Sequence, residues 1–202
     1  MKEEKGFYEK IGKRLLDILL SGTALILLSP ILIAISLMIK IDSRGPVFFK
    51  QERIGKNGVV FEIIKFRTMI ENAEKIGDGL SIKNERDSRI TQVGNILRKT
   101  SLDELPQLIN VFIGSMSLIG PRPPVTYHPY KGFENYPAHF KPRFNVKPGI
   151  SGYSQVKVRN SVSWDERIKL DLVYIKNITF TNDMKIIFQT FLRVLNSSNI
   201  YR

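Results

Sequence analysis

The chain has 202 residues, and 31 Lys and Arg side chains against 19 Asp and Glu give it a formal net charge of +12. It contains no cysteine and only two histidines, eleven residues apart. Disulfides, thiolate nucleophiles, iron–sulfur clusters and cysteine zinc sites are therefore excluded, and a site of paired imidazoles is disfavoured. The composition, 25% charged and 43% hydrophobic, is typical of a folded protein. The basic balance indicates a polyanionic partner: nucleic acid, anionic lipid or substrate phosphate.

Residues 18–39 form a run of 22 residues without a charge, long enough as a helix to cross a hydrocarbon layer of ~30 Å. A buried core helix is the alternative, but no stripe of the run is polar. Basic residues flank the run on both sides, and Ser29-Pro30 lies in its middle. Lys and Arg beside membrane segments prefer the cytoplasmic side, and proline kinks a helix. A spanning helix and a re-entrant helix both fit, and the two basic flanks favour the re-entrant one.

The segment after the apolar run has the pattern of a β-hairpin. A turn at 43–46 ends the run, and short strands are predicted at 47–51 and 59–66. The Asn-Gly pair in 55–58 is a strong signal for the turn between them. Residues 70–88 are polar and contain glycine, so we expect a long loop there.

The rest of the chain is predicted to be mainly helical, with helices at about 91–99, 103–112, 163–176 and from 182 or 183 onward. Ser163 and Glu166 have capping-box spacing at the third of these. The last helix has an apolar stripe bordered by Lys185 and Arg193, which fits either core packing or a basic helix on anionic lipid. The expected fold class is α+β: a membrane helix, a small hairpin and several helices, some amphipathic.

Asp103 and Glu104 form an isolated acidic pair, because nine basic residues and only three acidic ones lie between positions 98 and 160. Ser101 and Glu104 have capping-box spacing, and Asp103 as N-cap would place Pro106 in the first turn of a helix. A carboxylate beside Arg98 and Lys99 is expected to stay ionised, and it can then attack phosphorus or bind Mg²⁺. The residues alone leave helix capping and catalysis both open.

Basic residues near this pair in sequence would stabilise the charge that develops on phosphoryl oxygens during phosphoryl transfer. They are Arg98, Arg122 and Arg159, together with Lys65 and Arg67 on the predicted hairpin.

Over nearly its whole length, from about residue 8 to 195, the chain resembles the bacterial sugar transferases, the monotopic phosphoglycosyltransferases that begin glycan assembly on a polyprenyl phosphate. The resemblance depends on five motifs in the family's order: the apolar helix with Ser29-Pro30, Lys65-Phe66-Arg67-Thr68-Met69, Ser101-Leu102-Asp103-Glu104-Leu105-Pro106-Gln107, Met116-Ser117-Leu118-Ile119-Gly120-Pro121-Arg122-Pro123 and Pro148-Gly149-Ile150-Ser151-Gly152.

The resemblance implies transfer of a sugar 1-phosphate from a UDP-sugar to polyprenyl (undecaprenyl) phosphate, with release of UMP, by a ping-pong mechanism. Asp103 matches the family's nucleophile, which forms a covalent phosphosugar intermediate and lies near Mg²⁺. Glu104 matches its partner, for which a general-base or orienting role is expected. The remaining matched positions are the expected phosphate-binding residues Arg122, Arg98, Arg159 and Lys65, and an acid of unassigned role, Asp171.

The resemblance also implies a re-entrant first helix broken at Ser29-Pro30, with residues 1–41 in the membrane and a catalytic domain of residues 42–202 at the cytoplasmic face of the bacterial inner membrane. Anionic lipid is then a partner. The chain looks like the minimal catalytic form. Its departures from the family pattern are Ser115 in place of Asp, Tyr153-Ser154 where the family often has Trp-Ala, and Lys157-Val158 where it commonly has Asn-Gly.

Two other functions remain as alternatives. The charge and the aromatics Phe66, Tyr127 and Tyr153 would suit a membrane-tethered nucleic-acid-binding module, although no recognised binding motif is present and no nucleic acid is expected as a partner. The altered positions would suit an inactive scaffold of the same fold. The sugar pocket is expected in 70–88 or in 124–145, whose aromatics are equally suited to core or lipid contact.

Overall fold

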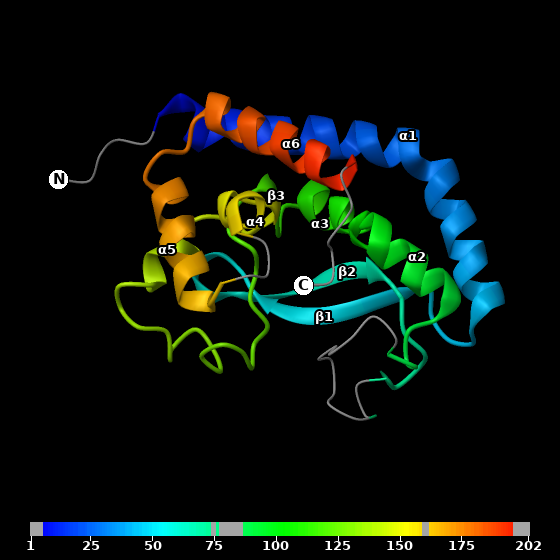
Figure 1. Cartoon of the computed structure of the whole chain (residues 1–202). Helices are drawn as coiled ribbons and strands as arrows, with labels where there is room; N and C mark the ends of the chain where they lie inside the picture. The colour runs from blue at the N-terminus through cyan, green and yellow to red at the C-terminus, as the bar shows by residue number, and fades with distance from the viewer. Residues whose placement is uncertain (1–5, 74–75, 77–86, 159–161, 196–202) are drawn as a thin grey trace.

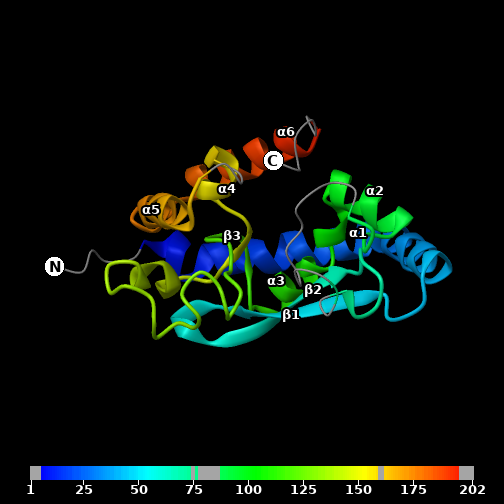
Figure 2. The same ribbon diagram turned by 60° about the horizontal axis from the view of Figure 1, so that its bottom comes forward.

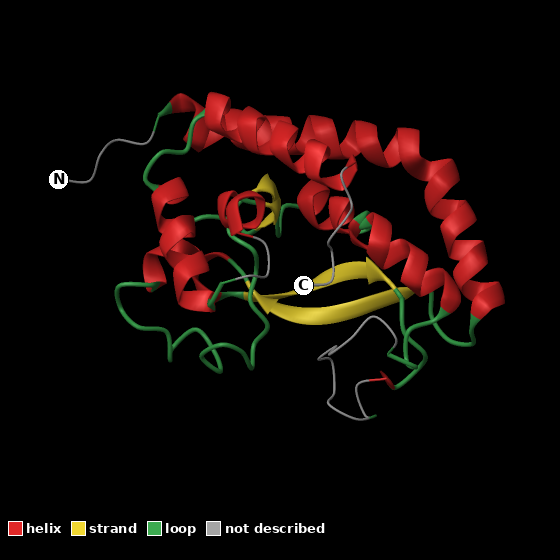
Figure 3. Ribbon diagram, in the orientation of Figure 1, coloured by secondary structure: helices red, strands yellow, loops and turns green. Residues whose placement is uncertain are grey.

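A computed structural model describes residues 6–73, 76, 87–158 and 162–195, and these form a helical structure with two small sheets (Figure 3). The α-helices are α1 (Lys13–Asp42), α2 (Gln92–Thr100), α3 (Gln107–Ile113), α4 (Tyr153–Val158), α5 (Trp164–Ile175) and α6 (Phe180–Leu195). Shorter helical turns are η1 (Tyr8–Gly12), η2 (Lys56–Gly58), η4 (Leu102–Glu104) and η5 (Lys141–Asn145). The mixed α and β content confirms the predicted fold class.

The larger sheet is the predicted hairpin of β1 (Phe48–Ile54) and β2 (Val60–Phe66). Asn57 and Gly58 adopt positive φ angles of 57° and 81° in its turn, as an Asn-Gly pair does readily. The smaller sheet is a parallel pair of β3 (Ser117–Ile119) and β4 (Gly149–Ser151), which the sequence did not indicate. The hairpin lies on the opposite side of the molecule from α6 in both views (Figures 1 and 2), and α3 contacts both β2 and α1.

The helix that starts at Tyr8 and ends at Asp42 is long and apolar enough to cross a membrane. Its residues stay helical through Ser29 and Pro30, so the predicted interruption at this pair is not seen. Pro30 has no N–H for the Ile26 carbonyl, and the Ser29 hydroxyl donates to that carbonyl instead, at 2.8 Å. The ribbon nevertheless changes direction part-way along α1 (Figure 1).

The N-terminal end of α1 is fixed to the rest of the protein by buried polar contacts. The Asp17 carboxylate accepts hydrogen bonds from the Leu118 amide at 2.9 Å and the Ser117 hydroxyl at 3.1 Å. Lys13 donates to Asp183 at the start of α6, and Tyr8 donates to the same carboxylate at 2.7 Å. A buried carboxylate is stable only with such partners, so these contacts fix the orientation of α1 relative to β3 and α6.

The C-terminal end of α1 is held by β2 and α2. Ile35 and Ile39 are buried against Phe66 of β2 and Leu97 of α2. The Asp42 carboxylate accepts a hydrogen bond from the Val93 amide at 3.1 Å. The middle of the helix makes no comparable packing, since Ile26 is 74% exposed and Leu27 is 71% exposed.

The aromatic residues between positions 124 and 145 mostly build a core. Tyr136, Phe140 and Phe144 are buried together with Ile54 and Ile168, and Tyr130 and Phe133 pack against them. Core contact, one of the alternatives for these residues, is therefore confirmed for this group. Tyr127 is the exception, with 54% of its surface exposed.

The four predicted helices are all present, as α2, α3, α5 and α6, but some of their predicted boundaries are wrong. The capping box of Ser163 and Glu166 is present at α5. The last helix begins at Phe180, two residues before the earlier of the two expected starts. The short helix α4 was not predicted. Most of the predicted 70–88 loop lies outside the described residues.

Candidate active site

The acidic pair lies in a turn and caps no helix. Asp103 and Glu104 belong to the single helical turn η4, and α3 starts only at Gln107, four residues after the predicted start. Neither Ser101 nor Asp103 accepts a capping hydrogen bond, and Ser101 has a left-handed conformation with φ 58°. Pro106 is the N-cap of α3, where its missing N–H costs nothing. Helix capping, one of the two alternatives left open for the pair, is therefore not seen, and neither carboxylate has a role in starting a helix.

Two of the predicted basic residues meet the pair at one oxygen. Lys65 Nζ lies 2.5 Å from Glu104 Oε1, and Arg122 Nη2 lies 3.3 Å from the same atom. Lys65 comes from β2 and Arg122 from the segment after β3, so three distant parts of the sequence converge here. Lys65 and Glu104 are both largely buried, which strengthens their ion pair relative to one in water.

The two neighbouring carboxyl groups have opposite pKa shifts. Burial raises the pKa of Asp103 to about 6, and the negative charge of Glu104 adds to this rise against the opposing charges of Lys65, Arg98 and Arg122. Burial also acts on Glu104, but Lys65 and Arg122 together lower its pKa to about 2. Arg98 lowers the pKa of Asp103, as the sequence led us to expect, but burial outweighs it; with a pKa of about 6 the Asp103 carboxylate is still mostly ionised at neutral pH.

A small cavity, open to solvent, lies beside the pair. Its lining residues are Arg53, Ile63, Lys65, Glu104, Gln107, Arg122, Pro123 and Gly149. Arg53 and Gln107 were not predicted. In the structure Arg53 pairs with Phe61, and Phe49 pairs with Lys65, so Arg53 and Lys65 lie on one face of the hairpin. The alternation of side chains along a strand is the sequence signal that could have found Arg53. The predicted first strand ended at Gln51, and Arg53 was therefore missed.

The other predicted basic residues have different positions. Arg98 Nε donates to the Thr68 hydroxyl at 2.7 Å, and its charge still acts on Asp103. The Arg67 guanidinium donates to Ser43 and to the Arg44 carbonyl, so it holds the turn after α1 and does not reach the acidic pair. Arg159 lies outside the described residues.

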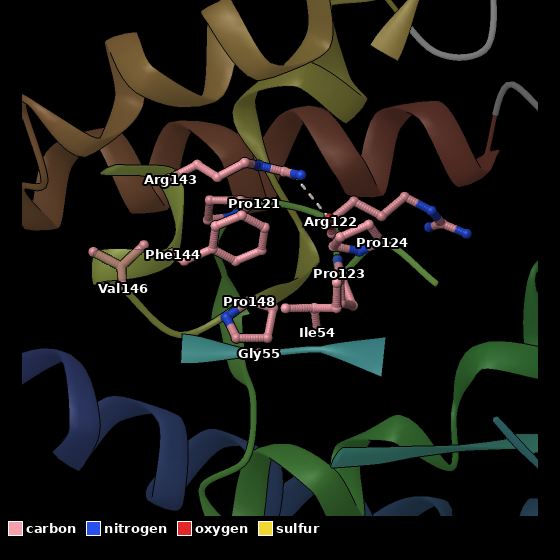
Figure 4. Close-up of a pocket in the computed structure, with 10 residues that line it drawn as sticks. All are labelled: Ile54, Gly55, Pro121, Arg122, Pro123, Pro124, Arg143, Phe144, Val146 and Pro148. Carbon is pink, nitrogen blue, oxygen red and sulfur yellow. Dashed lines mark hydrogen bonds between the residues drawn. The ribbon is translucent and has the colours of Figure 1, made fainter. Parts of the chain in front are cut away.

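Asp171 lies away from the pair, buried in α5. Its carboxylate accepts hydrogen bonds from Arg143 Nη2 at 2.8 Å and from the Ser154 hydroxyl at 2.6 Å. Arg143 Nη2 also donates to the Arg122 carbonyl at 3.0 Å, the contact drawn as a dashed line in Figure 4. Asp171 thus orients Arg143, which in turn holds the backbone that carries Arg122.

Loss of the Asp171 carboxylate should destabilise the fold strongly. Asp171→Leu leaves the Arg143 charge buried and unpaired, and we expect a loss of about 3–5 kcal/mol in the free energy of unfolding. The double variant Arg143→Met/Asp171→Leu should recover most of this loss. Denaturant unfolding in detergent measures both, with Asp165→Asn, an exposed acid of the same helix, as control. Equal stability of Asp171→Leu and the control would contradict the assignment.

Two departures from the family pattern have structural explanations. The Ser115 hydroxyl donates to the Asn110 carbonyl at 3.1 Å, and Asn110 in turn bonds the β2 backbone through its side chain, so Ser115 helps hold α3 against the hairpin. Lys157 lies on α4 with its ammonium 5.7 Å from the centre of the Tyr153 ring. The described contacts of Ser115 and Lys157 do not include the acidic pair.

The residues at the site are compatible with Mg²⁺. No cluster of three metal-ligating side chains occurs in the described ranges. Mg²⁺, however, is commonly held by one or two carboxylates together with substrate phosphates and water. No hydrogen bond from the described part of the chain occupies the Asp103 carboxylate, whereas Glu104 Oε1 already holds two cations. Asp103 is therefore the carboxylate with room for the ion.

Comparison with known proteins now decides the family. The model of the family described as "Bacterial sugar transferase" matches residues 8–197. The chain belongs to the bacterial sugar transferases. The match includes every described residue of the site, from Arg53 on β1 to Asp171 on α5.

Individual bacterial sugar transferases are similar over most of this chain. The exopolysaccharide production protein ExoY of Sinorhizobium fredii is 36% identical, over 98% of this chain and 93% of that protein. A UDP-glucose:undecaprenyl-phosphate glucose-1-phosphate transferase of Escherichia coli is 39% identical over 90% of this chain. A UDP-N-acetylgalactosamine-undecaprenyl-phosphate N-acetylgalactosaminephosphotransferase of Aeromonas hydrophila is 41% identical over 91% of this chain. The chain spans only 39% and 43% of the last two proteins.

Proposed function

We propose that this protein transfers a sugar 1-phosphate from a UDP-sugar to polyprenyl phosphate and releases UMP, as the first step of glycan or polysaccharide assembly. The observation that carries this proposal is the cavity in which Lys65, Arg122 and Glu104 meet, with Asp103 next to Glu104 in the same helical turn. Cations placed around an available carboxylate suit attack on a phosphoryl group. The names of the E. coli and A. hydrophila relatives support UDP-sugar and undecaprenyl phosphate as substrates.

The proposed mechanism is ping-pong, with Asp103 as nucleophile. One Asp103 oxygen attacks the phosphorus that carries the sugar, the bond from that phosphorus to the bridging oxygen breaks, and UMP leaves with the electron pair. A phosphate oxygen of the acceptor then attacks the same phosphorus, and the Asp103 carboxylate leaves. The product is a sugar joined to the polyprenyl chain through a pyrophosphate, and Asp103 is regenerated.

Glu104 is proposed to orient the two cations. A carboxyl group with a pKa of about 2 accepts a proton poorly near neutral pH, so a general-base role is disfavoured. Its Oε1 atom instead holds Lys65 and Arg122 on the cavity side of the pair. These cations are then in place for the charge that develops on the phosphoryl oxygens.

Asp103 is the residue proposed to hold Mg²⁺. When bound, the ion would neutralise phosphate charge on the donor and favour the ionised form of Asp103.

The rate of the first half-reaction should depend on pH through Asp103. The nucleophile must be ionised, and its pKa is raised to about 6, so kcat/KM for UMP release should fall as the pH drops below 6. A higher Mg²⁺ concentration should shift this fall in kcat/KM to lower pH, because a bound cation favours the ionised carboxylate. Initial rates between about pH 5 and 8, with circular dichroism to verify folding, measure it. A flat profile would contradict this assignment.

We propose further that α1 is re-entrant and that the protein lies on the cytoplasmic face of the bacterial inner membrane. Both ends of the helix contact one folded unit, through Lys13 and Asp17 at the start and Ile39 and Asp42 at the end. Ends on opposite sides of a membrane would not reach the same unit. The exposed middle of the helix provides the apolar surface for insertion. Basic residues at both ends suit contact with anionic lipid.

Topology can be tested with single cysteines, because the chain contains none. Lys10→Cys and Arg44→Cys place an exposed thiol at each end of the helix. In right-side-out vesicles we expect neither thiol to react with an impermeant reagent, and both to react after the vesicles are opened. Reaction of only one in sealed vesicles would show a spanning helix.

The transfer itself is tested by UMP release from a panel of UDP-sugars, with purified protein, undecaprenyl phosphate and Mg²⁺. Release that depends on one UDP-sugar, with formation of a polyprenyl-linked sugar, supports the proposal. Absence of UMP release with every sugar of the panel would favour the inactive-scaffold alternative.

A further inference from the structure

The cavity beside the acidic pair carries more positive charge than its carboxylates balance. Three cations line it, Arg53, Lys65 and Arg122, and Glu104 is already shared by the latter two. Glu104 is the one carboxylate among these lining residues, and adding an ionised Asp103 from the same turn still leaves three positive charges against two negative ones. A concave surface with this excess favours an anion.

Arg53 differs from the other two cations in its contacts. It donates to the Pro123 carbonyl at 3.0 Å and to Gln51 Oε1 at 2.6 Å, so both of its bonded partners are neutral. Its Nε atom is buried, and no acceptor for it is present among the described residues. A buried guanidinium N–H without an acceptor costs free energy, so the hydrogen bonds that Arg53 makes neither balance its charge nor satisfy all of its donors.

The position of Arg53 next to Arg122 is also unfavourable without an anion. Burial and the positive charge of Arg122 together lower the pKa of Arg53 to about 10, against the opposing effects of Tyr127 and Glu104. Arg53 remains protonated at neutral pH. Two guanidinium groups that repel each other in one cavity are typical of a site that is completed by its ligand.

We infer that Arg53 is a phosphate-binding residue, which together with Arg122 forms an anion subsite beside the Asp103–Glu104 pair. The inference rests on the proposed function for the identity of its ligand, a phosphoryl group of the substrate. That group belongs either to the pyrophosphate of the nucleotide sugar or to the phosphate of the lipid acceptor. The planar guanidinium suits two-point binding of phosphate oxygens better than an ammonium does.

The first test uses inorganic pyrophosphate as probe and needs no turnover. Isothermal titration calorimetry on the full-length protein in detergent should show Arg53→Gln binding about ten- to hundredfold more weakly than wild type. Lys50→Gln removes the same charge from an exposed position of the same strand and should bind as wild type. Arg53→Lys keeps a donor for the Pro123 carbonyl, and it serves as a second variant in case Arg53→Gln does not fold. Wild-type affinity in the folded Arg53 variants would overturn the inference.

The second test identifies the phosphate. Single-turnover UMP release without acceptor reports the donor, and discharge of the isolated phosphosugar enzyme by polyprenyl phosphate reports the acceptor. Slowing of the first step by Arg53→Lys assigns Arg53 to the nucleotide pyrophosphate, and slowing of only the second assigns it to the acceptor. Unchanged rates in both arms would overturn the inference. The wild-type protein could bind pyrophosphate, with weaker binding in Arg53→Gln, and yet release no UMP. That result would refute the proposed function and leave the inference about Arg53 standing.

Discussion

Asp103→Asn is expected to abolish turnover, with a loss of about 10⁴- to 10⁶-fold in UMP release, the range seen when an enzyme loses its nucleophile. The amide has nearly the shape of the carboxylate but cannot form the acyl phosphate bond. Transfer of radiolabel from a UDP-sugar labelled in the phosphate next to the sugar should disappear together with turnover. Both are measured on protein in detergent micelles.

The matched control for this variant is Glu52→Gln, which removes one exposed carboxylate from the hairpin that borders the site. It should retain wild-type turnover and labelling. Wild-type activity in Asp103→Asn would refute the nucleophile assignment. If Asp103→Asn loses turnover but is still labelled, the nucleophile is a residue other than Asp103.

Glu104→Gln is expected to lower kcat by about 10²- to 10³-fold, the usual cost of misplacing a group that stabilises developing charge. The amide cannot hold Lys65 and Arg122 as the carboxylate does, and both cations then lose their common position. Labelling of Asp103 should become slow but should still reach completion, because the nucleophile is intact. Single-turnover labelling measures this rate.

Glu62→Gln is the appropriate control, because Glu62 forms the exposed pair with Lys50, at 3.2 Å, on the same hairpin. Exposed ion pairs contribute little, so its kcat should be unchanged. An equal loss in both variants would show that Glu104 acts through general stability. If the fall in kcat/KM at low pH disappeared in Glu104→Gln, this would instead indicate proton transfer by Glu104.

The hairpin, α2 and α5 could be predicted because their signals are local. An Asn-Gly turn, the Thr91 side chain that caps α2 and the Ser163–Glu166 capping box each act over a few residues. The acidic pair itself was also recognisable, as two acids in basic surroundings and within a family motif. Lys65 and Arg122 were predicted near it, and the structure brings both to Glu104.

Other features depend on contacts between distant residues and could not be predicted. Asp171 has its partner Arg143 28 positions away, on a different element, so its buried ion pair left no local pattern. The parallel pairing of β3 with β4 joins two three-residue strands that are too short for a period to show. The raised pKa of Asp103 could not be predicted, because burial, which the sequence does not give, outweighs the nearby cations.

The most direct test of the account is intact-protein mass spectrometry of the wild-type enzyme mixed with UDP-sugar and Mg²⁺ without acceptor. We predict release of one UMP per enzyme and a mass increase equal to one sugar phosphate, located by peptide mapping on Asp103 and removed by polyprenyl phosphate. UMP release that strictly requires the acceptor, with no adduct on the protein, would show direct transfer and contradict the covalent mechanism.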